Sequence, residues 1–89
     1  MPTISIFYGI QIFMYFKDNV QHHEPHIHVQ YQSYKAVFAI NDARLIVGNL
    51  PNKQIRIIQA WIEIHQDDLL INWSLAIDGK DIFKIEPLR

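Results

Sequence analysis

The spacing of apolar residues changes near Gly48 and divides the chain into two kinds of predicted secondary structure. Before this point the apolar positions follow a period of two, and β-branched and aromatic residues dominate, which is typical of strands. The clearest stretch is 10–16, where four apolar side chains fall on one face: Ile10, Ile12, Met14 and Phe16. We expect a turn cluster at 17–19 to end this strand.

The residues that follow predict a β-meander. Two strands are expected over about 26–31 and 34–40, and the polar pair Gln32–Ser33 between them predicts a tight antiparallel hairpin. A shorter strand is expected over 43–47. Strands therefore occupy about 4–47, in an antiparallel arrangement of three to five.

The second part of the chain has a helical period. A first helix is expected over about 51–66, with Pro51 in its first turn, where the missing N–H costs no hydrogen bond. Its apolar stripe repeats at spacings of three and four: Ile55, Ile58, Ile62 and His65. A second helix is expected over about 68–78, with Asp67 or Asp68 as its N-cap.

The end of the chain completes the predicted architecture. Gly79 is placed to be the left-handed residue after the second helix, and 82–86 predicts a last short strand that returns to the sheet. Strands followed by helices favour an α+β class. We expect one domain over 1–89, an antiparallel β-meander of three to five strands packed against two C-terminal helices.

Composition narrows the range of functions. The 89 residues are 49% hydrophobic, which suffices for one small core, and the net charge of −1 does not support a basic nucleic-acid-binding domain. There is no cysteine, so disulfides, iron–sulfur clusters and thiolate chemistry are excluded. The start of the chain has no secretory signal pattern, and no apolar run has the length of a membrane span. We expect a cytoplasmic protein with no membrane partner.

Histidine is the residue type that marks a candidate site. Four of the five histidines lie within the seven residues 22–28. Imidazole is the commonest metal ligand and the side chain whose ordinary pKa lies nearest neutrality. Pro25 disfavours a helical conformation for Glu24, so the run predicts an extended approach to a strand. On that strand His26 and His28 share one face.

Two interpretations of this cluster remain open. In the first, three histidine nitrogens hold a divalent ion such as zinc or manganese, with Glu24 as a fourth ligand or a base: His22, His26 and His28. In the second, the histidines bond backbone groups at a strand–loop junction or stack on aromatic neighbours. Phosphate contact and acid–base chemistry are the remaining readings.

Several residues outside the cluster have two interpretations as well. Asn72 within a helix either bonds a buried backbone group or faces a binding site. His65 either caps the first helix or approaches the strand histidines. The basic side chains of Lys35, Arg44, Lys53 and Arg56 form a solvated face, or contact nucleic acid together with Tyr31 and Tyr34.

The chain resembles a prokaryotic family known as domain of unknown function 4160. The motifs that carry the resemblance span nearly the whole chain: Phe7-Tyr8-Gly9-Ile10, Met14-Tyr15, Pro25-His26-Ile27-His28-Val29, Gly48-Asn49-Leu50-Pro51, Asn72-Trp73 and Ile85-Glu86-Pro87-Leu88. The chain departs from the family pattern beside the paired histidines. Glu24 replaces the first proline of a Pro-Pro pair, Ile27 replaces an aromatic residue, and Gln21 stands where an acidic residue is usual.

The resemblance implies a functional context. Members of the family are often encoded beside a second short protein, in an arrangement like a toxin–antitoxin pair or a small regulatory operon. We therefore expect a binding or regulatory module of a toxin–antitoxin-like operon, acting with a partner protein encoded nearby or as a homodimer.

The alternative is a small histidine- or metal-dependent hydrolase or nuclease. It is centred on the cluster, with His26 and His28 as the candidate catalytic residues. Either a metal-bound water supplies the nucleophile, or two histidines act as base and acid. An enzyme of this kind needs His26 and His28 to be accessible and to converge on a cleft, whereas a binding module needs only a complementary surface.

Overall fold

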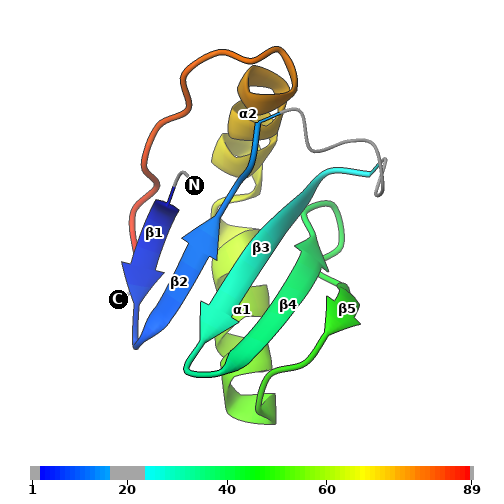
Figure 1. Ribbon diagram of the computed structural model, residues 1–89, viewed down its shortest axis with the longest axis vertical. Coiled ribbons are helices and arrows are strands. Elements are labelled where there is room, and N and C mark those ends of the chain that lie inside the picture. Colours follow the sequence, from blue (N-terminus) through cyan, green and yellow to red (C-terminus); the bar gives the residue numbers. More distant parts are fainter. Residues whose placement is uncertain (1–2, 17–23, 89) are drawn as a thin grey trace.

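A computed structural model describes residues 3–16 and 24–88, and it consists of one sheet backed by helices (Figure 1). Five strands follow one another across the sheet: β1 (Thr3–Phe7), β2 (Ile10–Phe13), β3 (His26–Tyr31), β4 (Tyr34–Ala39) and β5 (Leu45–Gly48). Two helices complete the order: α1 (Asn52–Ile64) and α2 (Gln66–Ile77). All neighbouring strands are antiparallel, so the predicted α+β fold with a meander and two C-terminal helices is confirmed.

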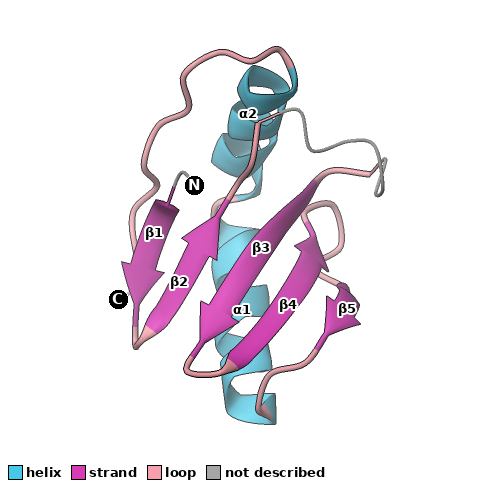
Figure 2. Cartoon of the chain, viewed as in Figure 1, coloured by secondary structure: helices cyan, strands magenta, loops and turns pink. Residues whose placement is uncertain are grey.

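Both helices lie on one side of the sheet (Figure 2). Helix α1 is directly behind the strands, and α2 extends toward the end at which β2 stops and β3 starts (Figure 1). Neither helix is long and apolar enough to cross a lipid bilayer. The opposite face of the sheet carries no helix in the part of the chain that the structure describes.

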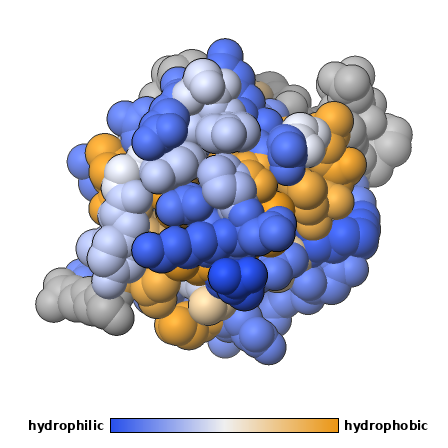
Figure 3. Space-filling model, turned by 90° about the horizontal axis from the view of Figure 1, so that it is seen from below, coloured by the Kyte–Doolittle hydropathy of each residue, from blue (hydrophilic) through white to orange (hydrophobic). Residues whose placement is uncertain are grey.

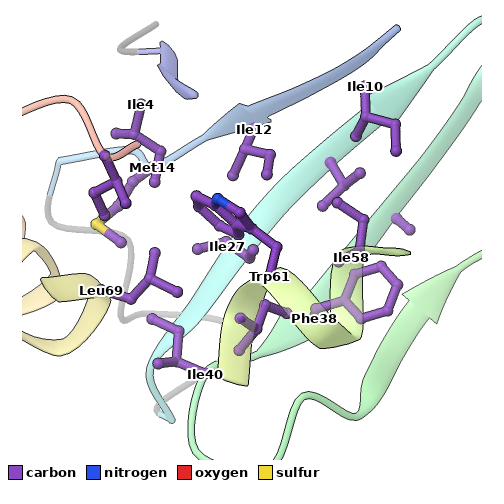
Figure 4. Close-up of a cluster of buried hydrophobic side chains, with 14 of the residues drawn as sticks. Ile4, Ile10, Ile12, Met14, Ile27, Phe38, Ile40, Ile58, Trp61 and Leu69 are labelled. Carbon is purple, nitrogen blue, oxygen red and sulfur yellow. The ribbon is translucent and has the colours of Figure 1, made fainter. Parts of the chain in front are cut away.

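The hydrophobic core fills the space between sheet and helices. Its largest fully buried side chains come from both layers and from the segment between them: Ile4, Ile10, Ile12, Met14, Ile27, Phe38, Ile40, Leu50, Ile58, Trp61, Ile62 and Leu69. In Figure 4, Trp61 extends from α1 toward the strands that carry Ile12 and Ile27. The indole Nε1–H of Trp61 donates to the carbonyl oxygen of Glu86 over 2.8 Å, so the buried ring leaves no polar atom unpaired.

One glycine fixes the edge of the sheet. Gly48 has a φ of 88°, and a Cβ atom added to it would lie 2.2 Å from the carbonyl oxygen of Lys35. Only glycine lets β5 end this close to β4. The predicted hairpin at Gln32–Ser33 is present between β3 and β4.

The strand predicted over 10–16 ends earlier than expected. Strand β2 stops at Phe13, and although Ile10, Ile12 and Met14 are buried together, Phe16 is 46% exposed. The chain leaves the sheet before Phe16, so the period-two pattern no longer describes which face a residue occupies. The expected turn at 17–19 lies outside the described residues.

The junction of the helices also differs from the prediction. Helix α2 begins at Gln66, so Asp67 and Asp68 lie in its first turn and His65 takes the N-cap position. His65 closes α1 through its N–H to Trp61, and its carbonyl oxygen then accepts from Leu69. Since a single residue joins the two helices, the second helix begins before either aspartate can cap it. The negative charges of the two aspartates still interact favourably with the positive end of the helix dipole.

The strand predicted over 82–86 is absent. The backbone N–H of Ile85 donates to the carbonyl oxygen of Ile4 over 2.8 Å, but Phe83 and Glu86 bond the side chains of Asn72 and Trp61 instead. A strand needs these backbone groups for a ladder with β1. The segment therefore runs beside β1 as an irregular strap, after the predicted left-handed Gly79, whose φ is 72°.

Candidate functional site

Strand β3 alternates its two histidines with two residues of the core. Ile27 and Val29 are buried between the sheet and the helices, and the alternation of the strand gives His26 and His28 a common face, which is open at His28 but is closed at His26, where the strand begins, by Trp73 of α2. The centroids of the two imidazole rings lie 5.2 Å apart. The prediction that these histidines share a face is confirmed.

His26 is fully buried at the start of β3. Its ring lies 4.8 Å from the ring of Trp73 in α2, and its Nδ1 is 2.9 Å from the carbonyl oxygen of Glu24. A carbonyl oxygen can only accept, so the proton of this bond belongs to Nδ1 of His26. The side chain thereby fastens the approach to β3 and packs on α2.

His28 lies in the middle of the open face, which is the face of the sheet that α1 does not cover. The strand register places it between Phe13 of β2 and Val37 of β4. The rings of Tyr15 and His28 pack edge to face, with their centroids 4.4 Å apart and their planes at 70°. Unlike His26, His28 is only partly buried.

The open face is hollowed around His28. The hollow has a volume of about 340 Å³ and reaches from β2 to β5. Its lining combines aromatic, aliphatic and basic side chains: Phe13, Tyr15, His28, Lys35, Val37 and Val47. None of the described residues that line it is acidic. We call this feature the open-face hollow.

Glu24 forms an ion pair at the rim of the sheet. Its carboxylate bonds the guanidinium of Arg44, which also bonds the carboxylate of Asp42 over 2.7 Å. Chiefly because it accepts a hydrogen bond from the backbone N–H of Arg44, Asp42 has a pKa below its usual value of 3.8. The hydrogen bond that the Arg44 guanidinium donates to the carboxylate of Asp42 in turn raises the pKa of Arg44.

Asn72 bonds backbone, as one of its two predicted interpretations requires. The side chain is fully buried in α2, its Nδ2 donates to the carbonyl oxygen of Phe83, and its Oδ1 accepts from the N–H of Phe83. His65 lies between the helices with its ring 5.4 Å from that of Trp61. Both residues therefore have evident packing roles, and a role of Asn72 in binding stays a prediction.

A family model described as Domain of unknown function (DUF4160) matches residues 9–74. The chain belongs to this family. The match includes β2 to β5, α1 and most of α2, and so the whole lining of the open-face hollow. Neither the curated proteins nor the solved structures contain a match to the chain.

The metal site predicted for this DUF4160 domain is not seen in the described part of the chain. Within residues 3–16 and 24–88, no group of three or more histidine, cysteine, aspartate or glutamate side chains is arranged to hold a metal ion. His22, the third predicted ligand, lies outside the described residues. His26 and His28 alone supply two ring nitrogens that a metal site would need to supplement.

Sequence reasoning did not single out the neighbours of His28 in the DUF4160 domain. The sequence patterns predict only strands for Phe13 and Val37, they include Tyr15 in the Met14-Tyr15 motif of the family, and they group Lys35 with basic residues that lie elsewhere. Strand alternation alone predicts that Phe13 faces away from Ile12. The register of three strands places Phe13, His28 and Val37 side by side. This register cannot be predicted from the local sequence of any one strand.

Proposed function

We propose that this DUF4160 domain is a binding module whose open-face hollow receives a segment of a partner protein. The observation that carries the proposal is the hollow itself, which has a volume of about 340 Å³, is lined by His28 and lies on the side of the sheet opposite α1. Interfaces place aromatic and aliphatic side chains at the centre of the contact and polar ones at its rim. The hollow has this composition, with Phe13 and Val37 within it and Lys35 exposed.

The chemistry of the lining indicates what kind of segment fits. Val47 is 51% exposed and adjoins the nearly buried Val37, so an apolar side chain of the partner would cover aliphatic surface there. Lys35 is a cation with no acidic neighbour among the described lining residues. A carboxylate on the segment would complement Lys35 and select the partner against basic competitors. The proposed occupant is therefore an apolar segment with at least one acidic residue.

Binding to the face is favoured over strand addition at an edge. The edge strand β5 has four residues, and its register against β4 shifts between Val37 and Phe38. Short and irregular edges discourage pairing with another strand. At the other edge, the strap donates from Ile85 to Ile4 of β1. These features leave the open face as the larger surface for a partner.

The hydrolase or nuclease alternative has less support. It needs His26 and His28 to be accessible together, and His26 is fully buried against Trp73 with its Nδ1–H donated to backbone. A proton donor or acceptor must reach the reacting group. The toxin–antitoxin-like setting of the domain rests on the family resemblance, which also suggests the protein encoded by the adjacent gene as the partner.

Titration calorimetry of the domain with the purified product of the adjacent gene tests the proposal. Lys35→Glu reverses the charge at the hollow and should weaken binding by about tenfold or more, because a like charge replaces a favourable one. Lys80→Glu, at an exposed site beyond α2, is the matched control and should bind like the parent. An affinity that Lys35→Glu leaves unchanged, or the absence of any complex, would contradict the proposal.

A second copy of the chain is the other candidate occupant. Light scattering across a range of concentrations separates this case, because a homodimer through the hollow would dissociate on Lys35→Glu in the absence of any other protein. A monomer that forms a one-to-one complex with the neighbouring protein fits the proposed heteromeric partner.

A further inference from the structure

A second cavity lies at the end of the sheet farthest from α2. It has a volume of about 570 Å³ and is formed by the β1–β2 turn, the end of β3, the start of α1 and the strap. Figure 3 views the molecule from this end and shows polar surface between hydrophobic patches. The cavity is lined by six residues and is called here the tyrosine pocket: Tyr8, Tyr31, Lys53, Gln54, Ile57 and Leu88. Its size is that of pockets that bind small molecules.

Tyr8 is held in an unusual conformation at the rim of the tyrosine pocket. It has a φ of 49° and precedes Gly9 with a φ of 74°, so both central residues of this turn are left-handed. Such turns favour asparagine followed by glycine, and a bulky side chain at this position is disfavoured. The Tyr8 side chain is nonetheless 60% exposed. The fold gains little burial from this ring, which meets Phe7 edge-on with the ring centroids 6.2 Å apart and otherwise faces solvent.

Two further tyrosines extend the aromatic surface. A Cβ atom added to Gly9 would lie 3.5 Å from Cε1 of Tyr31, so the turn rests against the Tyr31 ring. Tyr31 and Tyr34 are stacked, with centroids 6.5 Å apart and planes at 20°. Tyr34 is 39% exposed. The end of the sheet therefore carries three tyrosine rings, of which Tyr8 and Tyr34 are exposed and Tyr31 is partly buried.

The charge at the tyrosine pocket favours an anion. Lys53 is exposed, and no acidic residue occurs among the six that line the cavity or in the first turn of α1. Gln54 adds an amide that can donate and accept hydrogen bonds. Aromatic faces, one cation and one amide are the groups with which proteins bind a base, its phosphate and its polar edge.

We propose that the tyrosine pocket binds a nucleotide unit. The base stacks on Tyr8 and Tyr31, Gln54 bonds the base edge, and Lys53 pairs with the phosphate. A proline-rich peptide also suits tyrosine-lined grooves, but it makes no use of the cation at Lys53. The nucleotide is therefore the better match. It comes either from a free mononucleotide or from a single strand of RNA, which present the same base and phosphate.

Fluorescence anisotropy with labelled octauridine RNA and calorimetry with AMP test the site on the full chain. Tyr8→Asn removes the stacking ring, so this variant should bind the probes about tenfold more weakly than the parent. Because asparagine suits a left-handed turn, the variant should lose no thermal stability. Lys53→Gln should weaken binding about threefold and reduce its dependence on salt. Lys80→Gln is the matched control and should leave binding unchanged.

The two probes distinguish the source of the nucleotide. Binding of AMP that Tyr8→Asn weakens indicates a mononucleotide site, and binding of octauridine alone indicates a single-strand site. Either result supports the proposal. No saturable binding of either probe, or equal binding by Tyr8→Asn and the parent, overturns it. Binding of a polyproline peptide in place of both probes overturns it as well and assigns the tyrosine pocket to a peptide.

Discussion

Asn72 holds Phe83 at both of its backbone polar groups. Its Nδ2 donates to the carbonyl oxygen of Phe83 over 2.7 Å, and its Oδ1 accepts from the N–H of Phe83 over 3.0 Å. Asn72 is fully buried in α2, so one side chain ties the second helix to the strap that runs beside β1. The side-chain amide of Asn72 thus satisfies the two backbone groups of Phe83 that a neighbouring strand would otherwise bond.

Replacement of Asn72 by alanine should therefore destabilise the fold. The change removes both hydrogen bonds and leaves a small cavity, and we expect a loss of about 1–3 kcal/mol in the free energy of unfolding. Urea denaturation followed by tryptophan fluorescence measures it. Asn72→Asp places a carboxylate oxygen against the carbonyl oxygen of Phe83 in a buried site, so it should destabilise the fold at least as much as alanine. If Asn72→Ala kept full stability but lost partner binding, Asn72 would belong to a binding site instead.

The two histidines of β3 should respond differently to replacement. His26→Ala removes a buried ring from Trp73 and its bond to Glu24, and should cost about 2 kcal/mol or more of stability. His28→Ala should cost less than about 1 kcal/mol, because its side chain is only partly buried, yet it should weaken partner binding. Thermal denaturation and calorimetry together separate these effects. Equal losses of stability for the two variants would contradict the assignment of separate roles.

Gly48 should tolerate no side chain. Alanine there would bring Cβ to 2.2 Å from the carbonyl oxygen of Lys35 at a φ of 88°, so β5 must move away from β4. We expect Gly48→Ala to destabilise the fold by about 3 kcal/mol and to shift the NMR signals of Val37 and Val47.

Gly9→Ala is the matched control for this effect. Gly9 has a φ of 74°, but a Cβ atom added to it would make only an ordinary contact of 3.5 Å with Cε1 of Tyr31. It should therefore cost about 1 kcal/mol, from the backbone conformation alone. If Gly48→Ala cost no more than Gly9→Ala, the close approach of β5 to Lys35 would be of no consequence.

Acid should weaken the ion pairs at the rim of the sheet. The pKa of Asp42 is lower in the folded protein than its usual value of 3.8, so its contribution to stability is present above that value. The contribution is lost as the pH falls through the folded pKa. We expect the melting temperature to decline below about pH 4, and Asp42→Asn to reduce this decline. Because Asp42 is exposed, the effect is small, and parallel curves for Asp42→Asn and the parent would refute it.

The sequence alone determined the kinds of elements and the faces that they bury. Alternation in β3 predicted that His26 and His28 share one face of the strand and that Ile27 and Val29 share the other. Spacings of three and four predicted a stripe on α1, of which Ile58 and Ile62 are fully buried and Ile55 is partly buried. These predictions succeeded because the direction of a side chain within a strand or helix follows from the local backbone period.

Tertiary structure decided where elements end and which residues meet. The strap forms no strand because Asn72 and Trp61, distant in sequence, take the backbone groups that a ladder would use. The register of β2 to β5 places Phe13, His28 and Val37 side by side, and the packing of α1 against the sheet brings Lys53 to Tyr8. Contacts of this kind join residues as far apart as Ile4 and Ile85, which are 81 positions apart along the chain. No local period encodes them, because each depends on how several elements pack at once.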